Sequence, residues 1–284
     1  MKVLVLGVSG MLGNAMLRTL AEGSGVDAYG SARSASVRRY FSPELGERIL
    51  TGVDVENQDS LARVLAELRP QVVVNCIGLV KQLAEAEDPL AALPINAMLP
   101  HRLARLCALG GTRLVHVSTD CVFAGTRGNY RESDPSDALD LYGKSKFLGE
   151  VDYPHAITLR TSIIGHELAS AHGLVGWFLS QEKQIKGYSQ AIFSGLPTVE
   201  LARVVRDIVL PRPEMAGLYH MASAPISKLA LLRLIAEVYG KAVEIVPDDA
   251  VVINRSLNAD RFRVATGYVA PPWPELVKKM FEFK

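Results

Sequence analysis

A tyrosine and a lysine four residues apart, Tyr142 and Lys146, are the side chains whose types and spacing best suit acid–base chemistry. On a helix, residues four apart share one face, so the Lys146 ammonium would lie beside the Tyr142 phenol. A phenol with a pKa of about 10 is a poor acid at neutral pH unless its anion is stabilised. We expect Lys146 to lower the pKa of Tyr142, and the Thr119 hydroxyl to hold the carbonyl oxygen that Tyr142 protonates. Taken alone, Tyr-x-x-x-Lys is frequent by chance and typical of an exposed helix.

A glycine-rich turn near the start of the sequence makes this chemistry more specific. Residues 7–13 read Gly-Val-Ser-Gly-Met-Leu-Gly, directly after an apolar run and before an amphipathic stretch. Glycines between a strand and a helix let the backbone approach a pyrophosphate, which the helix N-terminus stabilises. The spacing is G-x-x-G-x-x-G and differs from the more common G-x-G-x-x-G. We expect a nicotinamide dinucleotide, the source of hydride for the carbonyl carbon, to contact Gly7, Ser9, Gly10, Met11, Leu12 and Gly13.

The residues after the second predicted strand decide which dinucleotide is preferred. An acidic residue there accepts the 2′-hydroxyl of NAD, whereas a basic one accommodates the 2′-phosphate of NADP. The sequence has Arg33, with Arg38 and Arg39 close behind and no carboxylate in that position. We therefore expect NADPH, with NADH as the alternative, and we place Arg33 at the phosphate unless these arginines are only solvated loop charges. Asp54 and its neighbour Val55 follow a further short strand, expected before the helix at 61–68, where Asp54 would contact adenine or form a turn.

Short apolar runs alternate with amphipathic stretches through the first half of the sequence, and these elements must position the residues above. Buried strands are predicted by apolar runs at 2–6, 26–29, 71–75, 113–117 and 156–160. Helices between them are predicted by the apolar spacing at 11–21, 61–68, 97–109 and 142–151. Repeated strand–helix–strand units with short connections predict an α/β fold with a doubly wound, parallel, Rossmann-type sheet. Thr119 then falls just past the strand predicted at 113–117, at the carboxyl edge where such sheets bind ligands.

The pattern changes after Gly165. Helical patterns at 175–181, 200–210 and 228–239 are separated there by loops that contain glycine and proline. We therefore expect two parts. The first is an NAD(P)-binding Rossmann domain at 1–165, and the second is a smaller C-terminal substrate lobe at 166–284. Some segments of that lobe are expected to return to the main sheet.

Composition excludes several classes of protein. Of the 284 residues, 49% are hydrophobic and 21% are charged, which excludes intrinsic disorder. A formal net charge of +1 gives no electrostatic footprint for nucleic acid or for an anionic membrane. No apolar run approaches the ~18 residues of a membrane helix, and the first strand leaves no room for a signal peptide, so we expect a cytoplasmic protein. Three cysteines without C-x-x-C spacing and six histidines without ligand spacing predict neither disulfides nor a metal site.

With these motifs in view, the sequence resembles the extended short-chain dehydrogenase/reductase superfamily and, more narrowly, the dTDP-4-dehydrorhamnose reductase family. The resemblance is close over 1–165 and looser afterwards. It is carried by the glycine turn and by residues 75–78, 118–125, Tyr130-x-Glu132, 142–150, 159–162, Gly195-x-Pro197-Thr198 and 255–261. It implies that Asn96 holds an interior helix in shape. It also implies that Thr119, Tyr142 and Lys146 are catalytic and that Asn75, Cys76, Ile77 and Gly78 line the cofactor together with Tyr142 and Lys146.

The substrate is expected beside the strands predicted at 113–117 and 156–160, in contact with Asp120, Cys121, Val122, His166 and Arg255. Arg255 suits the phosphates of a nucleotide because a guanidinium binds phosphate oxygens in pairs. Cys121 stands where members of the resembled family usually have an aromatic residue, and 163–166 replace a more aromatic stretch. Both changes leave the sugar and its nucleotide open. The related 4,6-dehydratases place a glutamate at this position as a base, a role that Cys121 cannot fill.

The resemblance implies an NAD(P)H-dependent oxidoreductase that reduces a nucleotide-linked 4-keto-6-deoxy sugar for surface-polysaccharide precursor synthesis. Two alternatives stay open. One is a non-catalytic, cofactor-binding regulatory subunit, although the intact set of Thr119, Tyr142 and Lys146 argues against it. The other is an epimerase/reductase that uses the same residues on a UDP- or GDP-linked sugar. The resemblance also suggests a homodimer.

Overall fold

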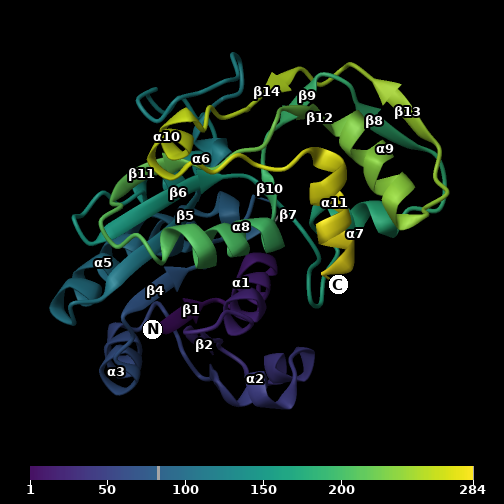
Figure 1. Ribbon diagram of the computed structural model, residues 1–284. Helices are drawn as coiled ribbons and strands as arrows, with labels where there is room; N and C mark the ends of the chain where they lie inside the picture. The colour runs from purple at the N-terminus through teal and green to yellow at the C-terminus, as the bar shows by residue number, and fades with distance from the viewer. Residues whose placement is uncertain (82–83, 284) are drawn as a thin grey trace.

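Seven parallel strands form the central sheet of the computed structural model, which describes residues 1–81 and 84–283 (Figure 1). In spatial order the strands are β11 (Gly217–His220), β6 (Ala156–Thr161), β5 (Arg113–Thr119), β4 (Val72–Asn75), β1 (Lys2–Leu6), β2 (Asp27–Ser31) and β3 (Ile49–Leu50). The chain runs outward in both directions from β1 and β4, where Leu6 pairs with Asn75. The predicted doubly wound, parallel α/β sheet is confirmed. Its ligand-binding crevice is expected at the carboxyl ends of β1 and β4.

Helices cover both faces of this sheet, because alternate residues of β1 point to opposite sides. Val3 and Val5 belong to one apolar cluster and Leu4 and Leu6 to the other, and all four are at most 1% exposed. The first cluster includes residues of α1 (Met11–Ala21) and α8 (Thr198–Val204). The second includes residues of α3 (Gln58–Leu68) and α5 (Leu99–Leu109). The core therefore consists of one sheet between two helical layers.

Several boundaries differ from the predicted ones. β5 continues through Ser118 and Thr119, placed just past it by the sequence pattern, because both residues pair with β6. The helix predicted at 97–109 begins earlier, with α4 (Pro89–Ala92) and the π-helix Leu93–Met98 leading into α5. α6 (Leu141–Leu148) ends before residue 151, at Gly149, where a Cβ would overlap the carbonyl oxygen of Asn96. α1 begins and ends as predicted, as does α9 (Lys228–Tyr239).

The second half of the sequence forms small sheets and also contributes to the main one. The small sheets join β12 (Ile226–Ser227) and β14 (Ile253–Asn254) to β9 (Ala191–Phe193), β13 (Ile245–Asp248) to β8 (Ile185–Tyr188), and β10 (Leu196–Pro197) to β7 (Ile163–Ile164). α7 (Leu174–Leu179), α9 and α11 (Trp273–Glu282) lie beside these sheets, to the right in Figure 1. β11 completes the main sheet, and α8 packs against α1.

Shorter elements complete the fold. They are α2 (Pro43–Glu47), α10 (Asp260–Thr266), the 3-10 helices Ala35–Tyr40, Ala84–Glu87 and Asp120–Val122, and the π-helix Val205–Val209. Among the residues that the structure describes, no helix combines the length and the apolar character needed to span a membrane.

Candidate active site

The turn between β1 and α1 has the backbone geometry of a phosphate-binding turn. Gly7 adopts φ = +84°, which favours glycine, and its carbonyl accepts a hydrogen bond from Gly10 N (3.1 Å). A Cβ on Gly13 would overlap the Gly7 carbonyl oxygen, so glycine is required there. Gly10 caps α1 without a side-chain hydrogen bond, which leaves the first N–H groups of the helix for an anion. These residues fit a dinucleotide pyrophosphate. The other predicted residues of the turn are exposed Ser9, half-buried Met11 and buried Leu12.

Arg33 follows β2 and is exposed. Arg38 donates to the Ile49 carbonyl (2.8 Å) and Arg39 donates to the Tyr40 hydroxyl (2.7 Å). Among the described residues, no side chain pairs with the Arg33 guanidinium. Of the three arginines in this stretch, Arg33 is therefore the one whose guanidinium makes no hydrogen bond with the described residues, and it stands at the end of β2, where a 2′-phosphate would bind.

Asp54 and Val55 lie between β3 and α3. Asp54 Oδ1 accepts a hydrogen bond from Glu56 N (3.0 Å), and Asp54 N donates to Ser60 Oγ (3.3 Å). These contacts match the turn role, one of the two roles predicted for Asp54. Val55 is buried in the apolar cluster that includes α3, so little of its side chain is left for an adenine ring.

The loop after β4 lies between the glycine turn and Lys146. Asn75 Oδ1 accepts a hydrogen bond from Ile77 N (3.1 Å), and Cys76 N donates to the last carbonyl of β1 (3.2 Å). A Cβ on Gly78 would lie 3.6 Å from Lys146 Nζ, so the backbone comes close to the lysine at this glycine. The structure therefore brings the predicted cofactor residues at 75–78 next to both the glycine turn and Lys146.

Asn96 connects this loop to α6. It lies in the π-helix Leu93–Met98 and is 1% exposed. Its Oδ1 accepts a hydrogen bond from Leu79 N (2.9 Å), and its Nδ2 donates to Leu79 O and to Ser145 Oγ (3.2 Å each). Because Ser145 lies between Tyr142 and Lys146 on α6, Asn96 fixes the position of the loop relative to that helix. These contacts agree with the shape-holding role that the resemblance implies.

Thr119, Tyr142 and Lys146 meet at the carboxyl end of β5. Thr119 is the last residue of β5, and its Oγ1 accepts a hydrogen bond from Cys121 N (3.1 Å). Tyr142 lies in the first turn of α6, and its phenol is close enough to the Thr119 side chain to be influenced by it. Gly143 allows this approach, because a Cβ there would overlap the Cys121 carbonyl oxygen. Lys146, one turn further on, donates from Nζ to a carbonyl of β5 (3.0 Å). The three predicted residues therefore form one cluster.

Burial sets the protonation of this cluster. Burial raises the pKa of Tyr142, and the neighbouring Cys121 raises it further, while the Thr119 side chain opposes the rise. The pKa of Tyr142 is therefore raised and not lowered as predicted, because the cost of burying the phenolate exceeds the effects that oppose it; the Lys146 ammonium donates to β5. Burial lowers the pKa of Lys146 to about 8, against the opposing charge of Glu150. At pH 7 the phenol is neutral, and so can give up a proton, while most Lys146 side chains carry a charge.

Two cations face a buried carboxylate beside Thr119. Asp120 is 7% exposed and accepts a hydrogen bond from the Thr119 hydroxyl (3.2 Å). Burial raises the pKa of Asp120, and the charges of Arg255 and Lys228 oppose that rise. Arg255 is a predicted site residue, whereas Lys228 is not. The Lys228 ammonium lies 4.4 Å from the centroid of the Phe193 ring. No sequence pattern marks Lys228, because its neighbours come from distant parts of the sequence.

The other predicted substrate residues have different surroundings. Burial raises the pKa of Cys121 to about 12, so its thiol stays protonated. Val122 is fully buried in a small apolar cluster, so its predicted substrate contact stays a prediction. His166 Nε2 lies 2.8 Å from the Tyr239 hydroxyl. Tyr239 ends α9, roughly 16 Å along the helix axis from Lys228. The structure therefore brings Cys121 to the cluster and places His166 at the other end of α9.

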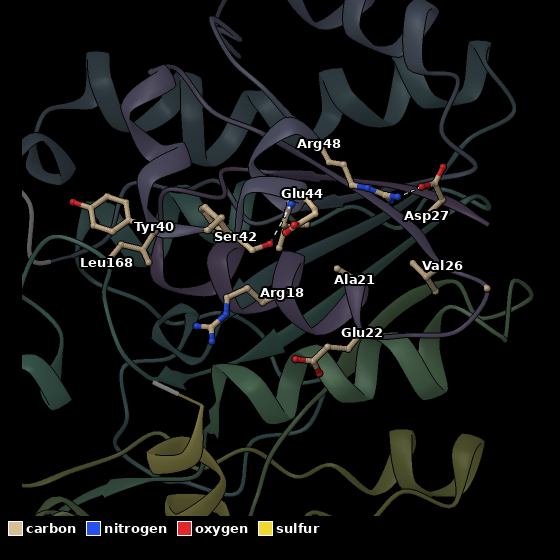
Figure 2. A pocket seen from close by; sticks show the side chains of 13 residues that line it. Arg18, Ala21, Glu22, Val26, Asp27, Tyr40, Ser42, Glu44, Arg48 and Leu168 are labelled. Carbon is tan, nitrogen blue, oxygen red and sulfur yellow. Dashed lines mark hydrogen bonds and ion pairs between the residues drawn. The ribbon is translucent and has the colours of Figure 1, made fainter.

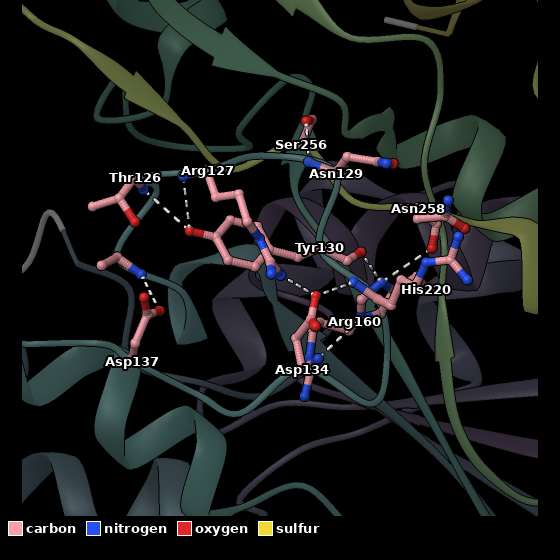
Figure 3. A network of polar contacts seen from close by, with 12 residues as sticks. Thr126, Arg127, Asn129, Tyr130, Asp134, Asp137, Arg160, His220, Ser256 and Asn258 are labelled. Carbon is pink, nitrogen blue, oxygen red and sulfur yellow. Dashed lines mark hydrogen bonds and ion pairs between the residues drawn. The ribbon is translucent and has the colours of Figure 1, made fainter.

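A buried ion-pair network joins Arg160, which lies beside His220 in Figure 3, to Glu150. Arg160 is 1% exposed and donates from Nε and Nη2 to the two carboxylate oxygens of Glu150 (2.9 and 2.6 Å). One of these oxygens also accepts a hydrogen bond from the Ser118 hydroxyl (2.6 Å). Arg160 Nη1 lies 2.9 Å from His220 Nε2 on β11. Sequence analysis did not single out this network, although Ser118, Glu150 and Arg160 all stand within motifs that carry the resemblance.

A cavity of about 980 Å³ lies at the opposite edge of the main sheet (Figure 2). Its walls come from the end of α1, the start of β2 and α2, and include Arg18, Glu22, Asp27 and Arg48. Because the strands are parallel, the start of β2 is on the edge away from the carboxyl ends that carry the predicted site. Arg48 and Asp27 pair with each other (2.6 Å). The cavity is therefore separate from the candidate active site.

Comparisons with known proteins agree with this geometry. The model of the family described as RmlD substrate binding domain matches residues 1–282. The chain is 27% identical over 253 residues to dTDP-4-dehydrorhamnose reductase of Salmonella typhimurium, which covers 80% of this chain and 84% of the relative. It is also 27% identical over 251 residues to methionine adenosyltransferase 2 subunit beta of Danio rerio, covering 84% of this chain and 74% of the relative.

A solved structure shares the fold. It is dTDP-4-dehydrorhamnose reductase from Bacillus anthracis in complex with NADP, with a TM-score of 0.80 and 21% identity, covering 100% of this chain and 98% of the other. The family model spans the glycine turn, the cluster of Thr119, Tyr142 and Lys146, and the predicted substrate residues. The chain is thus a member of the RmlD substrate binding domain family, within the extended short-chain dehydrogenase/reductases that its motifs resemble.

Proposed function

We propose that the protein is an NADPH-dependent reductase of a nucleotide-linked 4-keto-6-deoxy sugar, with a role in surface-polysaccharide precursor synthesis. The contact between Tyr142 and Thr119 beside Lys146 is the observation that carries this proposal. Reduction of a carbonyl needs a proton donor next to a group that holds the carbonyl oxygen, and this cluster supplies both. Relatives named dTDP-4-dehydrorhamnose reductase support the substrate class.

Each residue of the cluster has a separate task in this proposal. Tyr142 gives its proton to the oxygen at C4 of the sugar, and burial keeps the phenol in the neutral, proton-carrying form. Thr119 orients the same oxygen with its hydroxyl. Lys146 lies against Gly78, where its charge holds the cofactor ribose and stabilises the phenolate that remains after proton transfer. When bound, NADPH supplies the hydride for the carbonyl carbon.

The cofactor preference rests on Arg33. The glycine turn fits the pyrophosphate of either dinucleotide, because it offers backbone N–H groups and a close approach. Arg33 adds a positive charge that only the 2′-phosphate of NADPH uses. The relative from Bacillus anthracis in complex with NADP supports this choice.

The test follows the loss of reduced-nicotinamide absorbance with dTDP-4-dehydrorhamnose, made in place from dTDP-glucose, and compares NADPH with NADH. We expect rapid oxidation of NADPH, which Tyr142→Phe reduces by at least a hundredfold while NADPH still binds. Full activity in Tyr142→Phe would overturn the mechanism. Oxidation only with UDP- or GDP-linked keto sugars would keep the reaction type and change the nucleotide.

A second candidate is a non-catalytic subunit that keeps the cofactor fold. The observation in its favour is the similarity to methionine adenosyltransferase 2 subunit beta over 84% of this chain. This candidate predicts NADPH binding without turnover of any keto sugar, and a stable complex with a methionine adenosyltransferase. Co-purification of the two proteins, followed by light scattering, is the measurement that separates it from the reductase.

We also propose a homodimer in the cytoplasm. Leu90, Met98, Phe147 and Leu148 are 42–85% exposed, on α4, the π-helix Leu93–Met98 and α6, which contact one another. A partner copy would cover these apolar side chains. Three free cysteines agree with a reducing compartment. Light scattering at micromolar concentration is expected to give twice the chain mass, and Leu148→Ser is expected to lower it; a monomer in both cases would contradict the dimer.

A further inference from the structure

Two loops that are far apart in the sequence are joined beside the candidate active site. The first, residues 123–132, follows Val122, and the second, residues 253–258, precedes α10. Tyr130 N donates to a carbonyl of the second loop (2.9 Å), and Asn258 N donates back to the Tyr130 carbonyl (2.7 Å). We call these two segments the paired loops. The hydrogen bonds between the paired loops hold each loop in position against the other.

The paired loops carry Arg255. Its Nε donates to the Phe123 carbonyl in the other loop (2.8 Å). Among the described residues, its two terminal nitrogens make no hydrogen bond. The Arg255 charge also acts on Asp120, next to the catalytic cluster. The place of this guanidinium therefore depends on the pairing of the two loops, and its free nitrogens suit phosphate oxygens.

His220, the last residue of β11, fastens the paired loops to the main sheet (Figure 3). Its Nδ1 lies 3.1 Å from the Tyr130 carbonyl oxygen and 3.2 Å from that of Asn258, one in each loop. Its Nε2 lies 2.9 Å from Arg160 Nη1. Because arginine only donates, Nε2 is the acceptor and the proton is on Nδ1, which donates to both loop carbonyls. Burial and the Arg160 charge lower the pKa of His220 to about 3, so the ring is neutral at pH 7.

Arg160 gives His220 a rigid support. Both carboxylate oxygens of Glu150 hold the guanidinium, which also lies 4.9 Å from the centroid of the Phe123 ring. The Phe123 ring in turn stacks on the Tyr130 ring, with centroids 4.1 Å apart. The support and the paired loops therefore touch at two places, through the His220 ring and through these stacked aromatic rings.

We propose that His220 is a positioning residue for the substrate. Its Nδ1–H joins the Tyr130 and Asn258 carbonyls and holds the paired loops in register, so that Arg255 can bind the diphosphate of a nucleotide sugar. This inference rests on the proposed function for its substrate. In this role His220 acts through two backbone carbonyls and contacts neither the substrate nor the cofactor.

Two substitutions separate the two nitrogens of His220. In His220→Asn the side-chain amide nitrogen takes the place of Nδ1 and keeps the donor to the loop carbonyls. In His220→Gln the longer side chain reaches Arg160 and loses that donor. We expect His220→Gln to raise KM for the nucleotide sugar at least tenfold, with kcat within threefold and NADPH affinity unchanged. We expect His220→Asn to stay within threefold of the wild type in all three.

Amide hydrogen exchange measures how firmly the paired loops are held, without any substrate. Peptides that cover the paired loops are expected to exchange about tenfold faster in His220→Gln than in His220→Asn, with peptides from β1 and β4 unchanged. Arg255→Met is the matched control, because it is expected to raise KM while leaving the loops protected. If the wild type reduces no keto sugar, the proposed function fails and hydrogen exchange still decides whether His220 holds the loops.

Three outcomes would overturn the proposal. They are equal kinetics and exchange in the two His220 variants, faster exchange across the whole protein in His220→Gln, and an increase in KM for His220→Gln without faster exchange in the loops. The ring nitrogens of His220 in the wild-type protein give a test that needs no variant. Nitrogen-15 chemical shifts are expected to place the proton on Nδ1, and a proton on Nε2 would also overturn the proposal.

Discussion

Lys146→Met should stabilise the fold at neutral pH while it removes activity. Burial lowers the pKa of Lys146 from 10.5 to about 8, so folding disfavours the charged form. This lowering of the pKa corresponds to about 3 kcal/mol at pH 7, where the side chain is charged in both the folded and the unfolded state. Methionine has a similar length and no charge to bury. We therefore expect the variant to be up to about 3 kcal/mol more stable at pH 7, less what is lost with the hydrogen bond to β5.

The stability advantage of Lys146→Met should change with pH, and the direction of that change follows from the lowered pKa of Lys146. Because the folded-state pKa lies below the unfolded one, the penalty is complete below pH 8 and vanishes as pH rises past 10.5. The advantage of Lys146→Met should therefore shrink to about 1 kcal/mol or less at pH 10. Urea denaturation at pH 7 and pH 10 measures both values. Lys144→Met, at an exposed position of the same helix, is the control and should change stability little. A variant less stable than the wild type at pH 7, or an advantage that is the same at pH 10, would refute the reasoning.

Three further substitutions test other parts of the site. Gly13→Ala places a Cβ against the Gly7 carbonyl, and we expect a loss of about 1–3 kcal/mol in urea denaturation together with weaker NADPH binding; unchanged values for both would contradict the tight contact. Arg33→Glu should lower the preference for NADPH over NADH at least tenfold in kcat/KM, and an unchanged ratio would show that Arg33 is only a solvated charge. Lys228→Met removes a cation that acts on Asp120, so KM for the nucleotide sugar should rise at least fivefold while the dissociation constant of NADPH stays the same.

The main sheet could be predicted because its signals are local. The apolar run at residues 2–6 has no polar face, and a strand of this kind is stable only between two helical layers. Its alternate side chains do enter two separate clusters. The π-helix Leu93–Met98 could not be predicted from its own residues. Its geometry depends on Asn96, which bonds Leu79 and Ser145, and the Ser145 contact spans 49 positions.

The members of the candidate site could be predicted from the sequence, but the pKa of Tyr142 could not. Residue types and spacing were enough to group Thr119, Tyr142 and Lys146, because two of them share a helical turn and the third ends a strand. The predicted direction of the change in the Tyr142 pKa was wrong because residue spacing does not show how deeply the phenol is buried. The place of His166 was missed for a related reason, since its partner Tyr239 lies 73 positions away. Contacts between segments that are far apart in the sequence decide both the burial of Tyr142 and the place of His166.

Two buried cations near β5, Arg160 and Lys146, differ in how far the protein compensates their charges. Arg160 is surrounded by partners, with both oxygens of Glu150 and the His220 ring as acceptors, so its charge is compensated where it stands. Lys146 donates one hydrogen bond, to a carbonyl of β5, and burial leaves its pKa only about one unit above neutral pH. A charge that is poorly compensated by the protein is the one available to a ribose hydroxyl and to a phenolate. Under the proposed function, the same lack of partners that makes Lys146 unfavourable for folding makes it suitable for the reaction. Under the further inference, the full set of partners around Arg160 suits it to support the loops that carry Arg255.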